Sequence, residues 1–535
     1  MPEKPWYHEA VFFQLNVRAY VDSDGDGNGD FRGAITKLDY IRSLGVDCIW
    51  IQPMYMSPWR DGGYDIADYT DIHPDFGTID DFHDFLDAAH ERGLRVVIDL
   101  VMNHCSDQHP WFQAARALPN SLYRDYFVWS DTPHKYEGAR IIFLDVESSN
   151  WTYDEIAGQY FWHRFYSHQP DLNYDNPDVH EEMFRIVRFW LNMGIDGFRA
   201  DAVPYLYERE GTNCENLPET HAFLKKLRAM MDREYPGRVL IAEANQWPHD
   251  LLPYFGDGDE FQVCFHFPIM PRLYMALKAA DKTPIVNILA DTPPIPAGTQ
   301  WMTFLRNHDE LTLEMVTPEE RQWMWANYAA EPRARLNLGI RRRLLPLLEG
   351  DKRRWLALNA LFLSLLGTPI VYYGDEIGMG DNIWLDDRDG VRTPMQWAAA
   401  PHAGFTTGDK TYLPVIEQAP YDYRQVNVAA QENDPDSYLA WMRFLVAARQ
   451  SQPSLRSGAR EWVETGDVAV LAYWRRGAGE PVLCIFNLSD SVRPAGIAPE
   501  QDMRDLLSRE GRVYPAGQAI ALAPYAALWL VGAGA

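Results

Sequence analysis

The chain of 535 residues contains few cysteines and no long hydrophobic run. Its five cysteines are scattered, without a Cys-x-x-Cys pair or a metal-site spacing, which fits reduced thiols in a reducing compartment. The N-terminal stretch MPEKPWYHEAVFF has no apolar signal core, and no run approaches the length that crosses a bilayer. We therefore expect a soluble cytoplasmic protein without a membrane partner.

Basic residues are also in the minority. There are 49 Lys and Arg against 76 Asp and Glu, which gives a formal net charge of −27. Because a chain this acidic repels phosphate backbones, we expect no nucleic-acid partner. The 19 Trp, 28 Tyr and 24 Phe, by contrast, are enough to fill a large core and to line a pocket with rings.

One pattern recurs along the chain: an amphipathic helix, a glycine, a short apolar strand and then polar residues. Its copies run through residues 34–53, 80–104, 181–203, 224–247 and 355–376. Strands that alternate with helices in this way predict parallel βαβ units, and their near-continuous apolar character predicts burial on both faces. With further strands at 11–17 and 300–310, at least seven are counted, which favours a closed (β/α)8 TIM barrel over an open sheet.

Two regions interrupt this pattern. Residues 105–170 are long, aromatic and irregular between the third and fourth strands, as an inserted subdomain would be. After about residue 455 the chain changes to short strands separated by turns, which predicts an antiparallel β-sandwich domain. We therefore expect a barrel formed by 1–104 and 171–454, an inserted subdomain B at 105–170 and a C-terminal β domain at 455–535.

Each predicted barrel strand ends in polar residues. These are Asp99, Asn103, His104, Arg199, Asp201, Glu243, His308, Asp309, Asp375 and Glu376. Because a barrel brings the carboxyl ends of its strands to one rim, where active sites lie, the set predicts an active site. For any single member, a helix cap or a loop ion pair is the simpler alternative.

The loop YVDSDGDGNGDFRG at 20–33 looks at first like a calcium-binding EF-hand. Counting twelve residues from Asp22 reaches Gly33, where an EF-hand has a bidentate Glu, and the flank VFFQLNVRAYV is typical of a strand and not of a helix. A calcium sensor is therefore excluded. A static loop that holds a cation after a strand remains, with a solvated acidic turn as the alternative.

Four motifs then stand in a diagnostic order: DLVMNH (99–104), GFRADAV (197–203), AEAN (242–245) and FLRNHDE (304–310). In this order they resemble the signature regions of the α-amylase superfamily, the family 13 glycoside hydrolases. QPDLNY (169–174) resembles the extra region near the end of the family's inserted subdomain. Longer stretches, among them GTNCENLPETH (211–221) and MGDNIWLDDRDGVRTPMQW (379–397), are similar to the trehalose synthase branch of the family.

The resemblance implies an enzyme, an isomerase that interconverts the disaccharides maltose and trehalose. The implied reaction is an intramolecular transglucosylation by retaining double displacement through a β-glucosyl-enzyme, with minor hydrolysis to glucose. An α-glucosidase or oligo-1,6-glucosidase and a sucrose isomerase are the rival activities. A non-catalytic relative, such as the amylase-like ancillary proteins of transporters, would lack the full carboxylate set that is present here.

The resemblance also implies roles for individual residues. Asp201 would be the nucleophile, Glu243 the acid and base, and Asp309 the carboxylate that grips sugar hydroxyls. Arg199 precedes Asp201 by two residues on the same strand face and can hold it ionised. The implied substrate-binding residues are Tyr64, Asp65, His104, Arg199, His308 and Arg392. As alternatives to substrate binding, His104 and His308 could be core histidines with satisfied hydrogen bonds, and Arg392 could form an ion pair that stabilises its loop.

Two structural cation sites follow from the same resemblance, and no organic cofactor does. The first would use Asp22, Asp24, Asp26, Asn28 and Asp30. The second would use Asn103, Asp171 and Glu208 with the carbonyls of Tyr205 and Leu206. Hard oxygen ligands of this kind favour Ca²⁺, with Mg²⁺ as the alternative at the 22–30 loop. The expected partner is a small disaccharide, and a homo-oligomer is permitted without being required.

Overall fold

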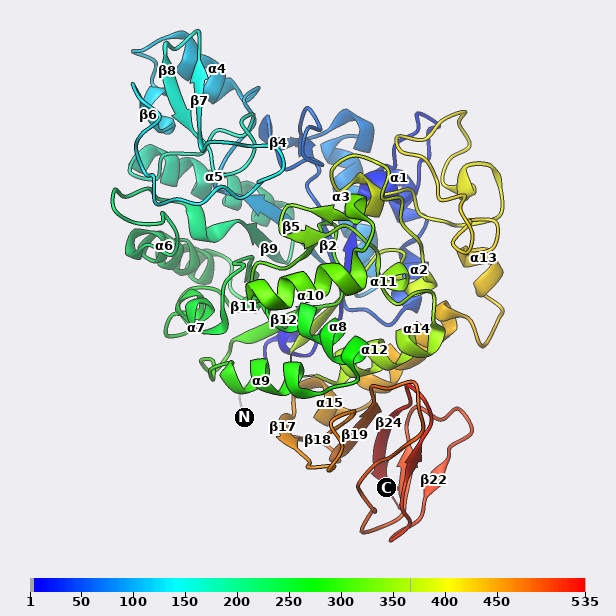
Figure 1. Cartoon of the computed structure of the whole chain (residues 1–535). Helices are drawn as coiled ribbons and strands as arrows, with labels where there is room; N and C mark the ends of the chain where they lie inside the picture. The colour runs from blue at the N-terminus through cyan, green and yellow to red at the C-terminus, as the bar shows by residue number, and fades with distance from the viewer. Residues whose placement is uncertain (1–3, 366, 535) are drawn as a thin grey trace.

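The computed structural model describes residues 4–365 and 367–534. Eight parallel strands close into a barrel at its centre (Figure 1). In order around the ring they are β1 (Phe12–Leu15), β2 (Cys48–Ile51), β5 (Arg95–Val101), β9 (Gly197–Asp201), β10 (Val239–Ala242), β11 (Val263–Phe265), β12 (Gln300–Phe304) and β16 (Thr368–Tyr372). The predicted (β/α)8 barrel is therefore confirmed.

The strand that the sequence pattern did not reveal is β11. It has only three residues, all buried, and a run this short carries no periodicity by which it could be recognised. Its neighbours hold it in the ring, because Val263 pairs with Ile241 of β10 and with Gln300 of β12.

The barrel interior is filled by side chains. Every residue of β2 and of β9 is buried, as expected for strands that are covered on both faces. Inside the ring, the aromatic rings of Trp50 and Phe265 lie 5.8 Å apart, and those of Phe265 and Phe304 lie 5.6 Å apart. Since the barrel interior is a packed core, the active site of such a barrel lies at the strand ends.

Helices surround the barrel and begin and end at recognisable signals. A capping box between Thr78 and Asp81 starts α3 (Ile79–Glu91). The side chain of Asn176 caps α5 (Pro177–Met193), which stops at Gly194 with a left-handed φ of 112°. Further helices of the outer layer are α6 (Pro218–Glu234), α8 (Ile269–Ala279), α9 (Thr283–Asp291), α12 (Lys352–Ser364) and α14 (Tyr438–Gln450).

The first predicted helix, at 34–45, is instead two short helices, α1 (Phe31–Ile35) and α2 (Leu38–Ser43). The side chain of Asp30 accepts a hydrogen bond from the Gly33 amide, so α1 begins earlier than the apolar pattern indicated. The Thr36 hydroxyl donates to the Gly33 carbonyl across 2.6 Å, a local bond that competes with continuation of the helix.

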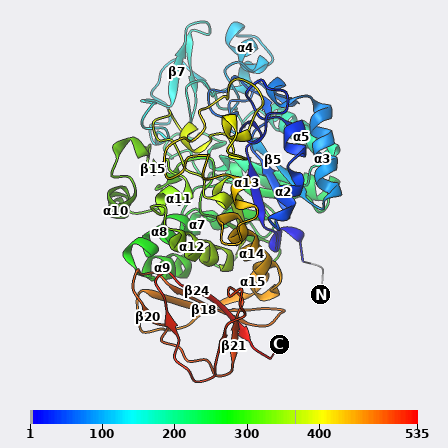
Figure 2. The same ribbon diagram turned by 90° about the vertical axis from the view of Figure 1, so that its right-hand side faces the viewer.

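An inserted segment follows the third barrel strand, β5. It contains α4 (Pro110–Ala117) and an antiparallel sheet in the order β6 (Trp129–Ser130), β8 (Gln159–Trp162), β7 (Trp151–Asp154). Both views place it at the end of the molecule opposite the C-terminal strands (Figures 1 and 2). Its Phe143 and Tyr166 pack in one cluster with Tyr205, which follows β9, so the insert borders the rim of the barrel.

The C-terminal region forms a six-stranded antiparallel sheet and a two-stranded one, as the predicted β domain requires. The larger sheet runs β17 (Ala459–Trp462), β18 (Val470–Arg476), β19 (Val482–Asn487), β24 (Ala527–Gly532), β21 (Met503–Asp505), β22 (Val513–Tyr514). The smaller sheet pairs β20 (Arg493–Pro494) with β23 (Ala521–Leu522). Side chains of both sheets share one core, which includes Ile485 and Leu522.

All five cysteines are buried free thiols. In the part of the chain that the structure describes, no helix combines the length and the apolar character needed to cross a membrane.

Candidate active site

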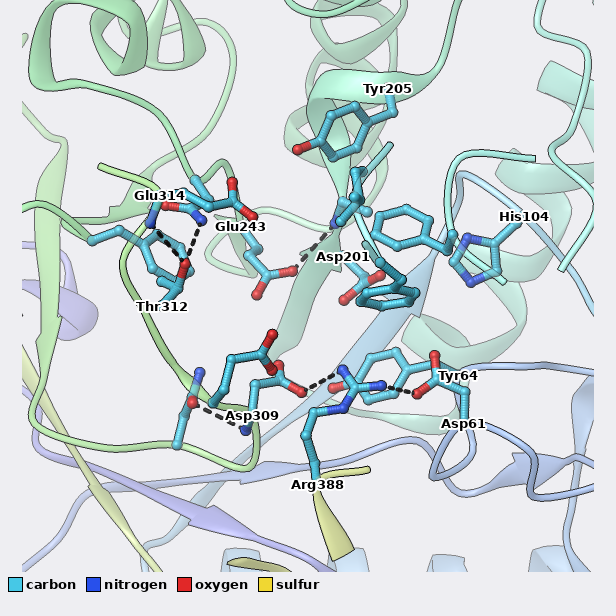
Figure 3. Close-up of a pocket in the computed structure, with 18 residues that line it drawn as sticks. Asp61, Tyr64, His104, Asp201, Tyr205, Glu243, Asp309, Thr312, Glu314 and Arg388 are labelled. Atoms are coloured by element: carbon cyan, nitrogen blue, oxygen red, sulfur yellow. Dashed lines mark hydrogen bonds and ion pairs between the residues drawn. The ribbon is translucent and has the colours of Figure 1, made fainter. Parts of the chain in front are cut away.

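A pocket opens at the carboxyl ends of the barrel strands (Figure 3). Its volume is about 850 Å³ with its open mouth included. The polar lining includes Asp61, Tyr64, His104, Asp201, Glu243, Asn307, Asp309, Glu310 and Arg388. Apolar lining comes from Phe267 and from Ile142, Phe143 and Phe165 of the inserted segment.

Arg199 of β9 holds two carboxyls of this pocket together. Its Nη1 lies 2.6 Å from Asp201 Oδ1, and its Nη2 lies 2.6 Å from Glu243 Oε1. The same Nη1 lies 2.5 Å from Asp99 Oδ1. Because one planar guanidinium pairs with all three, Asp201 and Glu243 face the same small volume.

The clamp formed by Arg199 is enclosed by the barrel core. Arg199 is 1% exposed and Asp99 is fully buried. The Trp50 indole N–H donates to Asp99 across 3.0 Å, and the Arg199 guanidinium lies 5.0 Å from the Trp50 ring. With water excluded, these charges interact more strongly than they would at a surface.

Burial gives the two carboxyls different proton affinities. It raises the pKa of Asp201 to about 6, although the Arg199 charge opposes the rise. It raises the pKa of Glu243 to about 8, and the nearby charges of Asp201 and Asp309 act in the same direction. At neutral pH, Asp201 is therefore ionised while Glu243 retains its proton. Such a pair can supply an anion and an acid at the same time.

Asp309 lies between two arginines and a histidine. Its Oδ1 is 2.9 Å from Arg388 Nη1 and 3.0 Å from Arg392 Nη2, while its Oδ2 is 3.1 Å from His308 Nε2. Burial alone would raise the pKa of Asp309, but these three neighbours hold it well below its usual range. Arg388 also pairs with Asp61, so one guanidinium joins two carboxylates of the pocket wall (Figure 3).

His308 is oriented from behind by Gln14 of β1. Gln14 Nε2 lies 2.7 Å from His308 Nδ1, and the Tyr64 ring stacks on the imidazole at 5.2 Å. Burial lowers the pKa of His308 well below its ordinary value, so the ring is neutral. The Gln14 amide nitrogen can only donate, so His308 Nδ1 is the acceptor and the ring hydrogen lies on Nε2, which faces Asp309.

The predicted substrate-binding residues fall into two groups. Tyr64 and His104 line the pocket, and Arg199, His308 and Arg392 contact lining carboxylates.

Asp65, by contrast, is fully buried in its own loop, where it accepts from the Ser57 hydroxyl and the Arg60 amide. Asp61, four residues earlier in the motif RDGGYDIADY, lines the pocket instead. Asp375 and Glu376 also lie elsewhere, paired with Arg343 and Tyr40.

Sequence reasoning missed several residues that shape the pocket: Gln14, Asp61, Arg140, Glu314 and Arg388. Arg388 lies within the stretch 379–397 that is similar to the trehalose synthase branch, and Asp61 lies three residues before Tyr64. The charge of both residues was the available signal. Nothing in the sequence pattern pairs Arg140 with Glu314, because they come from different loops 174 residues apart.

The inserted segment contacts the region that follows β12. Arg140 donates to Glu314 across 2.9 Å and to the Tyr205 hydroxyl across 3.1 Å. Further along the insert, Asp145 accepts from the Asn337 amide across 2.8 Å. Since Glu314 and Tyr205 both line the pocket, these bonds join two of its walls.

Three of the five predicted ligands in the 22–30 loop come together. Candidate ligand oxygens of Asp22, Asp24 and Asp30 all lie within 4.8 Å of one another. Asp26 instead caps the Asn28 amide, and the Asn28 side-chain oxygen accepts from Arg18 across 2.8 Å. Three clustered carboxylates are a donor set that a hard cation such as Ca²⁺ or Mg²⁺ would fit.

The second predicted cation site lies where the end of the insert meets β5 and the segment after β9. Asn103 and Asp171 are each 1% exposed, and Glu208 is 6% exposed. Among the described residues, Asn103 Oδ1, Asp171 Oδ2 and Glu208 Oε1 have no hydrogen-bond partner. Burial raises the pKa of Asp171 to about 8 and that of Glu208 well above its usual range. A cation bound by oxygens would satisfy these atoms, so the residues fit Ca²⁺.

A closed eight-stranded parallel barrel with an insert after its third strand and paired carboxyls at the rim defines a catalytic barrel of the glycoside hydrolase class. The model of the alpha amylase catalytic domain matches residues 14–458. The chain belongs to the α-amylase family.

Relatives within this family include two named for trehalose synthesis. The chain is 55% identical over 511 residues to the trehalose synthase/amylase TreS of Mycobacterium tuberculosis, covering 94% of this chain and 85% of that protein. It is 53% identical over 526 residues to the trehalose synthase of Pimelobacter sp., covering 96% and 91%. Among solved structures, the trehalulose synthase MutB from Pseudomonas mesoacidophila MX-45 is similar with a TM-score of 0.80 and 28% identity, covering 99% of this chain and all of that one.

Proposed function

We propose that this protein interconverts maltose and trehalose, the activity of a trehalose synthase. The observation that carries the proposal is the Arg199 clamp, which holds Asp201 and Glu243 in one pocket beside Asp309. Within the family, the choice of substrate is supported by relatives at 53–56% identity that bear the name trehalose synthase.

In the first step, Asp201 is the nucleophile and Glu243 the acid. A carboxylate oxygen of Asp201 bonds to the anomeric carbon of the non-reducing glucose of maltose, and the bond from that carbon to the bridging oxygen breaks. Glu243 gives its proton to the departing oxygen, which becomes the 4-hydroxyl of free glucose. The raised pKa of Glu243, about 8, keeps this proton available at neutral pH.

In the second step, the released glucose turns and presents its anomeric hydroxyl. Glu243, now a carboxylate, removes the proton of that hydroxyl, and the oxygen bonds to the anomeric carbon held by Asp201. The ester bond to Asp201 breaks and its carboxylate is restored. Two inversions give net retention, so the product has the α,α-1,1 link of trehalose.

The end of the pocket would grip a terminal glucose. Asp61 and Asp309, joined by Arg388, present charged acceptors that can bind sugar hydroxyls. The ring of Tyr64, stacked on His308, offers an apolar face for the sugar ring. Arg388 spans this end between Asp61 and Asp309, an arrangement that would suit a disaccharide better than an internal segment of a long chain.

Isomerisation also needs containment, because water that reaches the glucosyl-enzyme gives glucose instead of trehalose. We assign this role to the bonds between the insert and the region after β12, above all the pair of Arg140 with Glu314. Minor hydrolysis would reflect the fraction of time for which this contact is open. In this proposal, the barrel (1–104 and 171–454) carries out the chemistry and the insert (105–170) closes the pocket. The C-terminal domain (455–535) supports the barrel.

The cation sites have structural roles in this proposal. Ca²⁺ at Asn103, Asp171 and Glu208, with the carbonyls of Tyr205 and Leu206, would fasten the insert to the barrel close to Asp201. Ca²⁺ or Mg²⁺ at the 22–30 loop would brace the segment after β1. Five buried free thiols fit a cytoplasmic location.

The test is to incubate the purified protein with maltose, trehalose and sucrose separately and to resolve the sugars by chromatography. The proposal expects trehalose from maltose, maltose from trehalose and only a minor glucose peak. Glucose without trehalose would instead identify an α-glucosidase or an oligo-1,6-glucosidase. Conversion of sucrose to an isomer, with maltose untouched, would identify a sucrose isomerase.

A further inference from the structure

A second pocket lies between the barrel and the C-terminal domain. It has a volume of about 830 Å³ with its mouth included, and it shares no lining residue with the active site. Its walls come from the outer side of β12, from α8 and α9, and from β17 of the C-terminal sheet. Both ribbon views place α9 directly beside that sheet (Figures 1 and 2). There the backbone amide of Lys282 donates to the Val468 carbonyl across 2.8 Å.

The walls of this pocket are mainly apolar. They are formed by Ile269, Leu289, Pro293, Pro294, Ile295, Trp301 and Leu365. Trp301 is 4% exposed and belongs to the core, whereas the 292–295 segment is half-buried to exposed and forms the mouth. Walls of this kind favour a ligand with an apolar body.

Two polar side chains in the pocket already have partners. His266 Nδ1 accepts from the Ile269 amide across 3.2 Å, and His266 Nε2 lies 2.8 Å from the Thr292 hydroxyl. That hydroxyl donates to the Ile288 carbonyl across 2.8 Å. Neither His266 nor Thr292 therefore needs a ligand.

Arg460 of β17 is different. Its half-buried guanidinium lies 4.6 Å from the Trp462 ring and forms no ion pair or hydrogen bond with any described residue. Other buried arginines without a carboxylate, such as Arg449 and Arg475, donate to backbone carbonyls instead, whereas Arg460 has neither kind of partner among the described residues. A buried charge that lacks a partner is costly, and an anion would remove that cost.

We propose that this pocket binds a small monocarboxylate with an apolar body, whose carboxylate pairs with Arg460. The body lies between Trp301, Leu289 and Ile295, and the planar carboxylate matches the fork of one guanidinium. A phosphate dianion would need a second cation. The nearby Arg475 does not provide one, because it donates to the carbonyls of Ser364 and Leu455, each across 3.1 Å.

Such a ligand touches the barrel and the C-terminal domain at once. Because the pocket exists only when the two are docked, the ligand binds the folded state and raises the melting temperature with its concentration. The site is separate from the chemistry at Asp201, so Asp201→Asn is expected to bind the ligand as the wild type does.

The test uses octanoate as the probe and isothermal titration calorimetry with the full chain. Wild type is expected to bind one equivalent of octanoate. Arg460→Met is expected to bind it at least about tenfold more weakly, which is the loss expected for a charged hydrogen-bonded pair. The matched control is Arg504→Met, at an exposed position of β21, which leaves the affinity unchanged. Leu289→Trp, which fills the pocket, abolishes binding even if Arg460→Met perturbs the fold.

Two further probes test separately the need for a negative charge and the preference for a carboxylate over a phosphate. Octanol has the same body without the charge, so its weaker binding is expected to be equal in wild type and Arg460→Met. Octyl phosphate is expected to bind no more tightly than octanoate. Absence of saturable octanoate binding by the wild type overturns the proposal, as does equal affinity in Arg460→Met or retained affinity in Leu289→Trp. Tighter binding of octyl phosphate overturns the assignment to a carboxylate.

Discussion

Arg140 and Glu314 are 174 residues apart in the chain, yet Arg140 Nη1 lies 2.9 Å from Glu314 Oε2. Arg140 belongs to the inserted segment and Glu314 to the region after β12, so the pair joins two walls of the active-site pocket. Both side chains are partly shielded from solvent, at 35% and 15% exposure. In the proposed reaction, the pair would retain the released sugar and keep water out.

Weakening this pair should change the products more than the rate. In Arg140→Met and Glu314→Gln, we expect the ratio of glucose to trehalose formed from maltose to rise several-fold, because water reaches the glucosyl-enzyme more often. Chromatography of the products at equal maltose consumption measures this ratio. Arg443→Met, which breaks an ion pair with Glu432 at the surface, is the matched control. If the ratio of glucose to trehalose is unchanged in both variants, other residues must retain the released glucose and exclude water.

Asp201→Asn is expected to abolish turnover without unfolding the protein. An amide cannot form the glycosyl ester, and removal of a nucleophile typically lowers kcat by about 10⁴-fold or more. The circular dichroism spectrum and the melting temperature should stay close to those of the wild type, since the amide still fits beside Arg199. Asp178→Asn, at an exposed position of α5, is the control. Retained turnover in Asp201→Asn would refute the assignment of the nucleophile.

Much of this site could be predicted because of how parallel barrels are built. Asp201 ends one barrel strand, and Glu243 and Asp309 follow two others. Closure of the barrel brings strand ends together regardless of their spacing in the sequence. Five strands were recognisable because each follows an amphipathic helix and a glycine, and those at 11–17 and 300–310 by their apolar and aromatic residues. β11, with three residues, fell below that length.

Contacts between loops could not be predicted in the same way. Asp61 and Asp65 stand in one motif, and only the path of the loop places Asp61 at the pocket and Asp65 within the loop. Arg388 reaches both Asp61 and Asp309 from a segment without regular secondary structure, which has no period to fix its direction. Such contacts depend on tertiary packing and not on local pattern.

The pH dependence of kcat/KM should be bell-shaped. Activity requires Asp201 ionised and Glu243 protonated, so it falls below about pH 6 and above about pH 8, with the two limbs belonging to the coupled pair. Arg199 lowers both pKa values, since its positive charge favours the ionised carboxyls. Arg199→Met should therefore move both limbs to higher pH as well as reduce the rate. A profile that stays flat to pH 10 in the wild type would contradict the role of Glu243 as the acid.

Removal of divalent cations should lower stability. The unpartnered oxygens of Asn103, Asp171 and Glu208 are buried, so loss of a cation leaves them unsatisfied and weakens the attachment of the insert. We expect the chelator EGTA to lower the melting temperature by several degrees, since about 1 kcal/mol corresponds to a few degrees in a chain of this size. Added Ca²⁺ should restore it.

Variants separate the two cation sites. Asp171→Asn removes one charge from the buried site, and Asp22→Asn removes one from the 22–30 loop, so each should lose part of the response to Ca²⁺. Titration with Mg²⁺ after EGTA should restore stability mainly by binding at the 22–30 loop. Asp22→Asn should therefore abolish this response to Mg²⁺. Asp178→Asn, at an exposed position of α5, controls for general loss of acidic charge and should respond as the wild type does. If EGTA leaves the melting temperature of the wild type unchanged, and direct metal analysis finds no bound ion, then the loop is a solvated acidic turn and the buried oxygens are satisfied by water.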